Sequence, residues 1–342
     1  MTQPFVTIII PCFNEEKFIG TILDNLIAQD YPHDRIEVFA ADGNSKDRTP
    51  EIIRKYSEIH PFIHLLHNEK QYVPFALNMG ITQSKGEFII ILGSHAEYPA
   101  NYISSLIKAS LNLDADNVGG LLVSKPPDAS LRALAISQAL SCSFGVGNAH
   151  FRIGSKTIKQ VDTVTFGCYK RSVFDRIGLF DESLLRNQDD EFNARLVKNG
   201  GTIYLIPDIF VTYYTRSSVK SIRKMFYQYG LFKPFVSMKI GKPTTIRQLV
   251  PFIFVLFLLT FIPMAMISNV AALLFAVGMG VYILADLTFS VRVAREANRA
   301  GLMLFLPWLF FLIHLSYGWG YLRGIVKFLI LHQEIKTIAH TR

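Results

Sequence analysis

FVTIIIPCFNEE, residues 5–16, decides the fold of the first half of this 342-residue chain. Its first six residues are apolar or β-branched and end at a proline, which is the pattern of a short buried strand. Asn14 can then cap a helix whose apolar side chains recur at helical spacing through residues 18–27, and Glu15 and Glu16 suit its first turn. The stretch therefore predicts a strand followed directly by a helix.

The same alternation continues along the chain. The segments with a strand pattern are residues 36–40, 62–66 and 87–92, and those with a helix pattern are 49–59 and 74–84. Alternation at this pace predicts an α/β domain with a mostly parallel sheet, which we place at residues 1–215. In such a sheet ligands bind beyond the carboxyl ends of the strands. The loops of interest are therefore the ones that follow strands: PCFNEE, ADGNSKD and GSHAEYP.

The last third of the chain is apolar. Three segments with the composition of membrane helices occur at residues 249–267, 270–285 and 302–322, and about 20 residues cross the hydrocarbon core. Only Ser268-Asn269 separates the first two, which predicts a tight hairpin. The third segment either spans the membrane or is re-entrant. We predict an α-helical membrane domain over residues 248–342.

The net charge of +8 is concentrated in one block. Residues 216–247 hold eight basic residues and no acidic residue, immediately before the apolar segments. A solvated basic face or a nucleic-acid patch would have this composition, but the position favours contact with membrane lipids rather than nucleic acid. We read the block as an amphipathic interface helix that turns some of its apolar side chains toward lipid: Met225, Phe226, Tyr229 and Phe232.

Charge also predicts location. The loop after the second apolar segment carries Arg292, Arg295 and Arg299, which places it on the cytoplasmic side together with the basic block. Three cysteines without a CxxC pair fit a reducing compartment and argue against a structural zinc site. We expect a multi-pass protein of the cytoplasmic (inner) membrane whose first domain faces the cytoplasm.

Two acidic positions stand out as chemical groups. Asp42 follows a strand and can accept a hydrogen bond from a bound heterocycle or ribose, although the stretch taken alone favours an Asx turn that caps the next helix. Asp189, Asp190 and Glu191 open a helix, where the dipole favours acidic residues in any case. One carboxylate at such a helix start, facing a cleft, is also a suitable general base.

Five stretches taken together resemble glycosyltransferase family 2, and in particular membrane-anchored, succinoglycan-type exopolysaccharide glucosyltransferases. The stretches lie in the same order as in that family and cover about residues 5–210: PFVTIIIPCFNEEKFIGTIL, ADGNSKDRT, PFALNMGITQSKGEFIIILGSHAEYP, FGCYKRSVFDRIGLFDE and NQDDEFNARL. The resemblance implies a GT-A fold, which is Rossmann-like, a nucleotide-sugar donor and inversion at the anomeric carbon.

The resemblance also implies site residues by position. Asp189 stands at the position where the family has its catalytic base. The positions that would contact the nucleotide-sugar are Pro11, Phe13, Glu15, Ser94 and Asp42, the last at the uracil. The positions on the acceptor side are Gly167, Cys168, Gln188 and Asp190.

Two positions depart from the family pattern. Gln188 stands where the family has a Glu before the base, which removes a charge but keeps hydrogen bonding. In the metal loop, Gly93 replaces the first aspartate and His95 occupies the second position. We expect a divalent metal, Mn²⁺ or Mg²⁺, held weakly by His95 with Glu97 as a possible helper. Alternatively, Lys70 offsets part of the diphosphate charge that the metal would otherwise offset.

The expected function is inverting transfer of a hexose, glucose first, from a UDP-sugar to a lipid-diphosphate-linked saccharide in exopolysaccharide or cell-surface glycan synthesis. One alternative is a polyprenyl-phosphate sugar transferase, whose acceptor is a phosphate and needs no base. An alternative of another class is a catalytically silent glycan-binding or scaffold subunit, which the loss of the aspartate at Gly93 suggests.

Overall fold

The computed structural model describes residues 3–333, which form two compact units. The first unit runs from the N-terminus to Val123 and includes Gly154–Tyr213, and the second combines Ser124–Ile153 with the chain from Tyr214 onward. The second unit thus takes in residues 124–153, which the sequence-based boundaries assign to the first domain.

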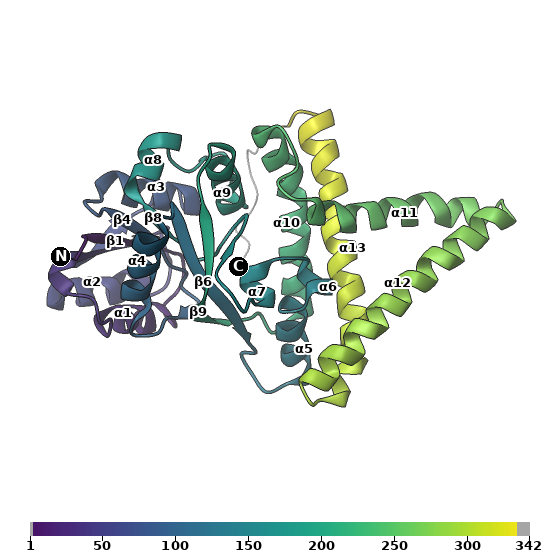
Figure 1. Cartoon of the computed structure of the whole chain (residues 1–342), viewed down its shortest axis with the longest axis horizontal. Coiled ribbons are helices and arrows are strands. Elements are labelled where there is room, and N and C mark those ends of the chain that lie inside the picture. Colours follow the sequence, from purple (N-terminus) through teal and green to yellow (C-terminus); the bar gives the residue numbers. More distant parts are fainter. Residues whose placement is uncertain (1–2, 334–342) are drawn as a thin grey trace. The chain divides into compact units, whose positions relative to one another are not determined.

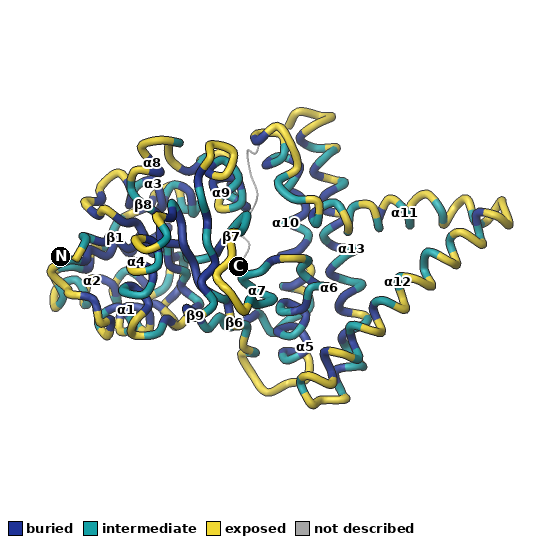
Figure 2. Tube along the Cα trace, viewed as in Figure 1, coloured by how far each residue is buried: buried dark blue, intermediate teal, exposed yellow. Residues whose placement is uncertain are grey.

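A parallel sheet forms the centre of the first unit. Its four strands lie in the order β3-β2-β1-β4 and pair in parallel. They are β1 (Val6–Cys12), β2 (Ile36–Asp42), β3 (Ile63–His67) and β4 (Phe88–Ile91). The β-branched residues of β1 are buried, as Figure 2 shows for this part of the sheet, so burial on both faces explains the continuous apolar run.

The sheet continues beyond β4 with antiparallel strands, so it is mixed. The order of the complete path is β3-β2-β1-β4-β8-β6-β9-β5, and β7 pairs with β9. The added strands are β5 (Ala96–Glu97), β6 (Asn117–Lys125), β7 (Lys159–Gln160), β8 (Cys168–Lys170) and β9 (Ile203–Tyr214). The predicted α/β class, a sheet domain followed by a helical unit, is confirmed, but the sheet is mixed and not mostly parallel as predicted.

Helices connect the strands of the first unit (Figure 1). They are α1 (Ile19–Ile27), a 3₁₀ turn (His33–Arg35), α2 (Thr49–Ile59), α3 (Val73–Gln83), α4 (Tyr102–Leu113), α8 (Arg171–Ile177) and α9 (Gln188–Lys198). The predicted cap at Asn14 is wrong, since α1 begins five residues later at Ile19. Asn14 has a φ of 55° and its side chain contacts the loop after β2 instead of a helix.

Apart from the ends of β6 and β9, the regular structure described in the second unit, up to residue 333, is helical. The helices are α5 (Leu131–Leu140), α6 (Ser143–Val146), α7 (His150–Ile153), α10 (Val219–Ile240), α11 (Val250–Ala265), α12 (Asn269–Glu296) and α13 (Leu306–Gly324), with 3₁₀ turns at Ile246–Leu249 and Ala300–Leu304 and a π turn at Ile325–Ile330. A buried apolar cluster joins α5, α10, α13 and the end of α12.

Glycines set the close packing of α10 on α13, which lie side by side in Figure 1. A Cβ on Gly230 would lie 2.0 Å from the carbonyl oxygen of Tyr317, and one on Gly320 would lie 2.1 Å from that of Tyr227. Small residues let helix backbones approach to this degree. The glycine-rich end of α13 therefore serves packing.

This packing corrects the interpretation of residues 216–247 as a lipid-facing helix. Met225, Phe226 and Phe232 are buried in the second unit and Tyr229 packs against its apolar cluster. The prediction that these side chains face lipid is wrong, because α13 and α5 supply the apolar partner that the sequence pattern left open.

The hairpin prediction is confirmed, since α11 ends at Ala265 and Ser268 caps α12 by accepting a hydrogen bond from the backbone N–H of Ala271. Ile246–Ala265 and Asn269–Glu296 are both long and apolar enough to cross a membrane. Figure 2 shows that α11 and α12 are largely exposed along their length. A pair of long apolar helices with few protein contacts needs another apolar environment.

Candidate active site at the strand ends of the first unit

The loops that follow β1 and β2 are joined by hydrogen bonds from backbone N–H groups to side-chain oxygens. The N–H of Asn14 donates to Ser45 Oγ (2.8 Å), and the N–H of Lys46 donates back to Asn14 Oδ1 (2.8 Å). The N–H of Glu15 donates to Thr49 Oγ1 (2.7 Å). These reciprocal bonds fix the two loops to each other at the carboxyl end of the parallel strands, where Pro11, Phe13 and Asp42 also lie.

Asp42 is only 3% exposed and its carboxylate holds its own loop. Both the backbone N–H and the hydroxyl of Ser45 donate to it, at 3.2 and 2.5 Å. This is the Asx-type turn that the sequence left as one of two readings. Contact of Asp42 with a nucleobase stays a prediction.

Glu15 and His95 form a pair across the ends of β1 and β4. His95 Nε2 lies 3.2 Å from Glu15 Oε1, and the carboxylate is 1% exposed while the imidazole is 40% exposed. The ring of Phe18 contacts the imidazole edge-on, with centroids 4.7 Å apart. At this distance the carboxylate, which only accepts, could take a proton from Nε2, and Nδ1 would then be the acceptor of a neutral ring.

Phe166 occupies the space that a side chain at position 93 would need. A Cβ on Gly93 would lie 2.4 Å from the Phe166 ring. The Tyr98 hydroxyl fixes the same loop, because it lies 2.8 Å from the backbone N and 3.2 Å from the backbone O of Gly93. Phe166 itself has a φ of 51° and its carbonyl accepts a hydrogen bond from Tyr102. The glycine in the metal loop is therefore coupled to an aromatic residue in the loop before β8.

The predicted base lies at the exposed start of α9. Asn187, with a φ of 59°, precedes the helix, and Asp189 is exposed while Gln188 and Asp190 are half-buried. Burial, and after it the charge of Asp189, raises the pKa of Tyr169. The charge of Asp189 at the start of α9 is therefore felt by the buried Tyr169 of β8.

A buried polar network supports this helix and was not predicted from the sequence. Asn193 Oδ1 accepts from Asn117 Nδ2 (3.2 Å) and from the Tyr169 hydroxyl (3.0 Å), and Asn193 Nδ2 donates to Thr163 Oγ1 (2.8 Å). Asn193 is one helical turn after Asp189 and is 0% exposed. The network fixes the first turns of α9 against β6 and β8.

The same network constrains the predicted acceptor-side turn. A Cβ on Gly167 would lie 2.4 Å from Asn117 Oδ1, so this position needs a glycine. Cys168 is fully buried, and burial raises the pKa of its thiol, which therefore stays neutral. Any contribution of Cys168 to an acceptor contact would come from its backbone.

The metal prediction can be tested against the donor atoms present. Within residues 3–333 no three His, Cys, Asp or Glu side chains group as a metal site. Ser94 is 5% exposed and Phe166 fills the space at position 93, so the His95 imidazole is the main protein donor of this loop, and Glu97, which is exposed in β5, stays a predicted helper. These residues fit a metal that is held jointly by one imidazole and by phosphate oxygens of a nucleotide.

A mixed sheet of this order, with polar groups at the strand ends and an acidic helix start, agrees with the fold expected of a glycosyltransferase, and sequence comparison assigns that class. Residues 7–178 match the sequence profile of "Glycosyl transferase family 2", and the chain belongs to that family.

Relatives of known name agree with this assignment. The chain is 33% identical over 333 residues, 94% of its length and 98% of the relative, to the dolichyl N-acetyl-α-D-glucosaminyl phosphate 3-β-D-2,3-diacetamido-2,3-dideoxy-β-D-glucuronosyltransferase of Methanococcus voltae. It is 26% identical over 253 residues, 73% of this chain and 76% of the relative, to the succinoglycan biosynthesis protein ExoA of Rhizobium meliloti.

Solved structures share the fold. The mannosyltransferase PcManGT of Pyrobaculum calidifontis, determined in complex with GDP-Man and Mn²⁺, superposes with a TM-score of 0.57 and 19% identity, over 93% of this chain and 88% of that one. A divalent metal therefore occurs in a protein of this fold.

Proposed function

We propose that the protein transfers a sugar, with inversion, from a nucleoside-diphosphate sugar to a hydroxyl group of a lipid-phosphate-linked saccharide. The observation that carries the proposal is the position of Asp189, which is exposed at the start of α9 above a fixed polar network. A carboxylate in this setting is accessible to a substrate and held in direction by its helix.

In the proposed reaction Asp189 accepts the proton of the acceptor hydroxyl. The oxygen then attacks the anomeric carbon from the face opposite the leaving group, and the nucleoside diphosphate departs with the electron pair of the broken bond. The new glycosidic bond has the inverted configuration. Asp190 and Gln188, half-buried next to the base, are proposed to contact the acceptor.

The charge on the departing diphosphate needs compensation. We propose that His95 would hold a divalent metal through Nδ1, and that Glu15 would keep the ring in the required tautomer by accepting from Nε2. A bound metal would supply Lewis-acid stabilisation of the leaving group. Glu15 then acts on His95 rather than on the nucleoside directly.

We predict that His95→Ala lowers the affinity for Mn²⁺ in the presence of UDP by at least about 10-fold, and that Glu15→Gln lowers it to a smaller degree. Electron paramagnetic resonance of free Mn²⁺ in a titration measures this without turnover. Glu16→Gln is the matched control, because Glu16 accepts only from the backbone of the neighbouring loop. Equal Mn²⁺ affinity in His95→Ala and in the unchanged protein would refute the assignment.

Our candidates for the donor sugar come from similar proteins. UDP-glucose is our first candidate, as the resemblance to succinoglycan-type enzymes suggests. A UDP-linked acetamido uronic acid is the second, because the relative from Methanococcus voltae is named for transfer of such a sugar. Hydrolysis of a panel of UDP- and GDP-sugars, with and without membrane lipid extract, separates the candidates.

We further propose that α11 and α12 insert as a hairpin into the cytoplasmic membrane, with the first unit in the cytoplasm. The two helices have the length and composition of spans, and the basic residues of 216–247 and of the end of α12 match the sign expected on a cytoplasmic face. Membrane insertion holds the enzyme where a lipid-linked acceptor resides. Reaction of single cysteines at Ile267 and Arg299 with an impermeant reagent, in sealed vesicles of known orientation, tests this topology.

The two rival functions predict different results. A polyprenyl-phosphate sugar transferase would keep its activity without Asp189. A silent scaffold subunit would bind no UDP with or without Mn²⁺ and would hydrolyse no donor in the panel.

A further inference from the structure

The segment between α8 and α9, residues 178–187, forms neither helix nor strand and leads directly to the proposed base. Asp189 is the second residue of α9, so the direction of its side chain depends on how this segment enters the helix. A stretch without a hydrogen-bond ladder of its own is held in place by side chains that bind its backbone. Arg195 and Asn78 are two side chains of this kind.

Arg195 binds the start of the segment. Its Nη1 donates to the carbonyl of Ile177, and its Nη2 donates to the carbonyl of Leu179 at 2.8 Å. Ile177 ends α8, and Gly178, which lies between the two carbonyls, has a φ of 79°. One guanidinium therefore joins the end of α8 to α9.

Glu191 holds the guanidinium in this orientation. Its Oε1 lies 2.8 Å from Arg195 Nε and its Oε2 lies 3.0 Å from Arg195 Nη2, so the two charged groups meet as a fork. Glu191 is buried and follows Asp189 by two residues. Arg195 thus donates through Nε and both η nitrogens in one planar arrangement, which a lysine cannot supply.

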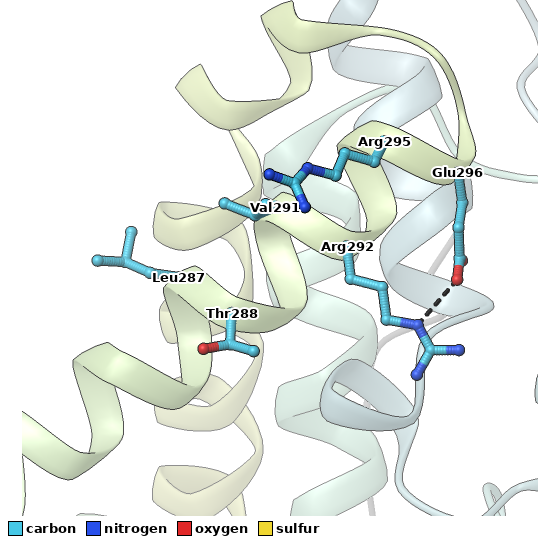
Figure 3. A pocket seen from close by; sticks show the side chains of 6 residues that line it. All are labelled: Leu287, Thr288, Val291, Arg292, Arg295 and Glu296. Atoms are coloured by element: carbon cyan, nitrogen blue, oxygen red, sulfur yellow. Dashed lines mark hydrogen bonds and ion pairs between the residues drawn. The ribbon is translucent and has the colours of Figure 1, made fainter.

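Burial distinguishes this ion pair from an exposed pair of the same residue types. Figure 3 shows Arg292 and Glu296 of α12, which are also four residues apart and have Nε and Oε1 at the same 2.8 Å. Their side chains are 69% and 62% exposed, against 22% for Arg195 and 5% for Glu191. An exposed pair contributes little, whereas removal of Arg195 would leave a buried carboxylate without its cation.

Asn78, which lies in α3, binds the next residue of the segment. Its Oδ1 accepts from the backbone N–H of Phe180 at 2.9 Å, and its Nδ2 donates to the backbone O of the same residue at 2.9 Å. Nδ2 also lies 3.0 Å from Glu182 Oε1. The ring of Phe180 stacks on that of Phe192 in α9, with centroids 4.3 Å apart. The segment is therefore fixed both to α3 and to α9.

We propose that Arg195 and Asn78 are positioning residues for Asp189. They hold the segment that enters α9 and so keep the carboxylate in the direction in which it takes the proton of the acceptor hydroxyl. Both act through the backbone of residues 177–180 and not on the substrate. A misplacement of about 1 Å at a reacting group lowers a rate about 100-fold. The inference rests on the proposed function, in which Asp189 is the base.

Chemical rescue of Arg195→Ala in the full-length protein tests the proposal. The substitution is expected to lower the turnover number about 100-fold and to leave the Kd for UDP within about a factor of two. Guanidinium chloride, far below the concentration that unfolds the protein, should raise the turnover at least about 10-fold, because the ion can take the place of the missing group beside Glu191. Urea at the same concentration carries no charge and should have no effect.

Arg176→Ala is the matched control. Arg176 is exposed in α8, and its Nη2 lies 2.8 Å from Asp116 Oδ1, so this variant also removes a guanidinium–carboxylate pair from the first unit. Its turnover should stay within about a factor of two of that of the unchanged protein, with no response to guanidinium.

Asn78→Asp tests the second contact. It keeps the acceptor for the N–H of Phe180 but turns the donor that faces the carbonyl of Phe180 and the carboxylate of Glu182 into an acceptor. Turnover should fall to a degree similar to that in Arg195→Ala, without a response to guanidinium. The same measurements on this variant decide the question if Arg195→Ala does not fold.

Hydrogen exchange of the backbone amides follows the segment without any substrate. In Arg195→Ala the amides of residues 178–187 should exchange at least about five-fold faster, as the loss of hydrogen bonds from a charged group allows. Guanidinium should slow this exchange again, whereas urea should not.

Four results would overturn the proposal: unchanged turnover in Arg195→Ala, a loss that guanidinium leaves unaltered, an equal loss in Arg176→Ala, or a weakening of UDP binding as large as the fall in turnover. Asp189→Asn is measured on the same preparations. If Asp189→Asn keeps its turnover, the proposed function fails, and the exchange measurement still decides whether Arg195 holds the segment. If Asp189→Asn loses its turnover while turnover and exchange in Arg195→Ala are unchanged, the positioning role alone is rejected.

Discussion

Asp189→Asn is expected to lower the turnover number for sugar transfer by at least about 100-fold, and by up to about 10⁴-fold. The amide has the shape of the carboxylate but cannot accept the proton of the acceptor hydroxyl. The exposed position of Asp189 means that the substitution leaves no buried charge unpaired, so the fold should be retained. The measurement is the transfer rate at saturating donor and acceptor, with the Kd for UDP as a check that the donor site is intact.

Asp190→Asn is the matched control for this prediction. It removes the same charge one residue later, from a half-buried position that is rotated about 100° around α9. We expect a loss of no more than about 10-fold, because this carboxylate would contact the acceptor without taking its proton. Near-normal turnover in Asp189→Asn would exclude a base at this position and favour the polyprenyl-phosphate sugar transferase.

Three strands of the parallel sheet, β1, β2 and β4, were predictable because each is buried on both faces, whereas β3 at the end of the strand order is partly exposed. Residues 5–10 are then apolar or β-branched throughout and residues 88–92 are apolar, and the helix at 49–59 has the predicted bounds. The antiparallel strands β5 and β7 were not predictable, since each has two residues and depends on β9, which is distant in sequence.

A site residue could be predicted where the local sequence pattern marks it. It could not be predicted where its role depends on partners that are distant in the sequence. Asp189 at a helix start carries a local signal. Asn193 carries none, because its partners Asn117, Tyr169 and Thr163 come from three other segments. Gly93 was noticed as a missing aspartate, but only the structure places the Phe166 ring against it.

Prediction of the apolar C-terminal segments from the sequence was limited in the same way. Composition alone assigned 302–322 to the membrane, yet nearly half of α13 is buried against other helices of its unit. The mean hydropathy of a stretch of residues cannot distinguish burial in protein from burial in lipid. The glycines of α13 distinguish the two, because close backbone contact requires a protein partner at a defined position.

Gly320→Ala is therefore expected to destabilise the second unit by about 3 kcal/mol or more, at the upper end of the range for overpacking. The added Cβ would lie 2.1 Å from the carbonyl oxygen of Tyr227 and 3.0 Å from the backbone N of Leu231. These are backbone atoms of α10, so no side-chain rotation can relieve the contact. Thermal unfolding in detergent measures the effect, and both tryptophans of the chain, Trp308 and Trp319, lie in α13 and report on that helix.

Gly280→Ala is the matched control, since a Cβ there meets nothing within 4 Å. The same chemical change should raise stability slightly, by up to about 1 kcal/mol, because alanine favours the helix. The two variants thus share the gain in helix propensity and differ in the contact with α10, so the difference between their unfolding midpoints isolates the packing. Equal midpoints would mean that α13 and α10 are not held at this separation. The long apolar helix at 306–324 would then again be a candidate for insertion into lipid, as its sequence suggests.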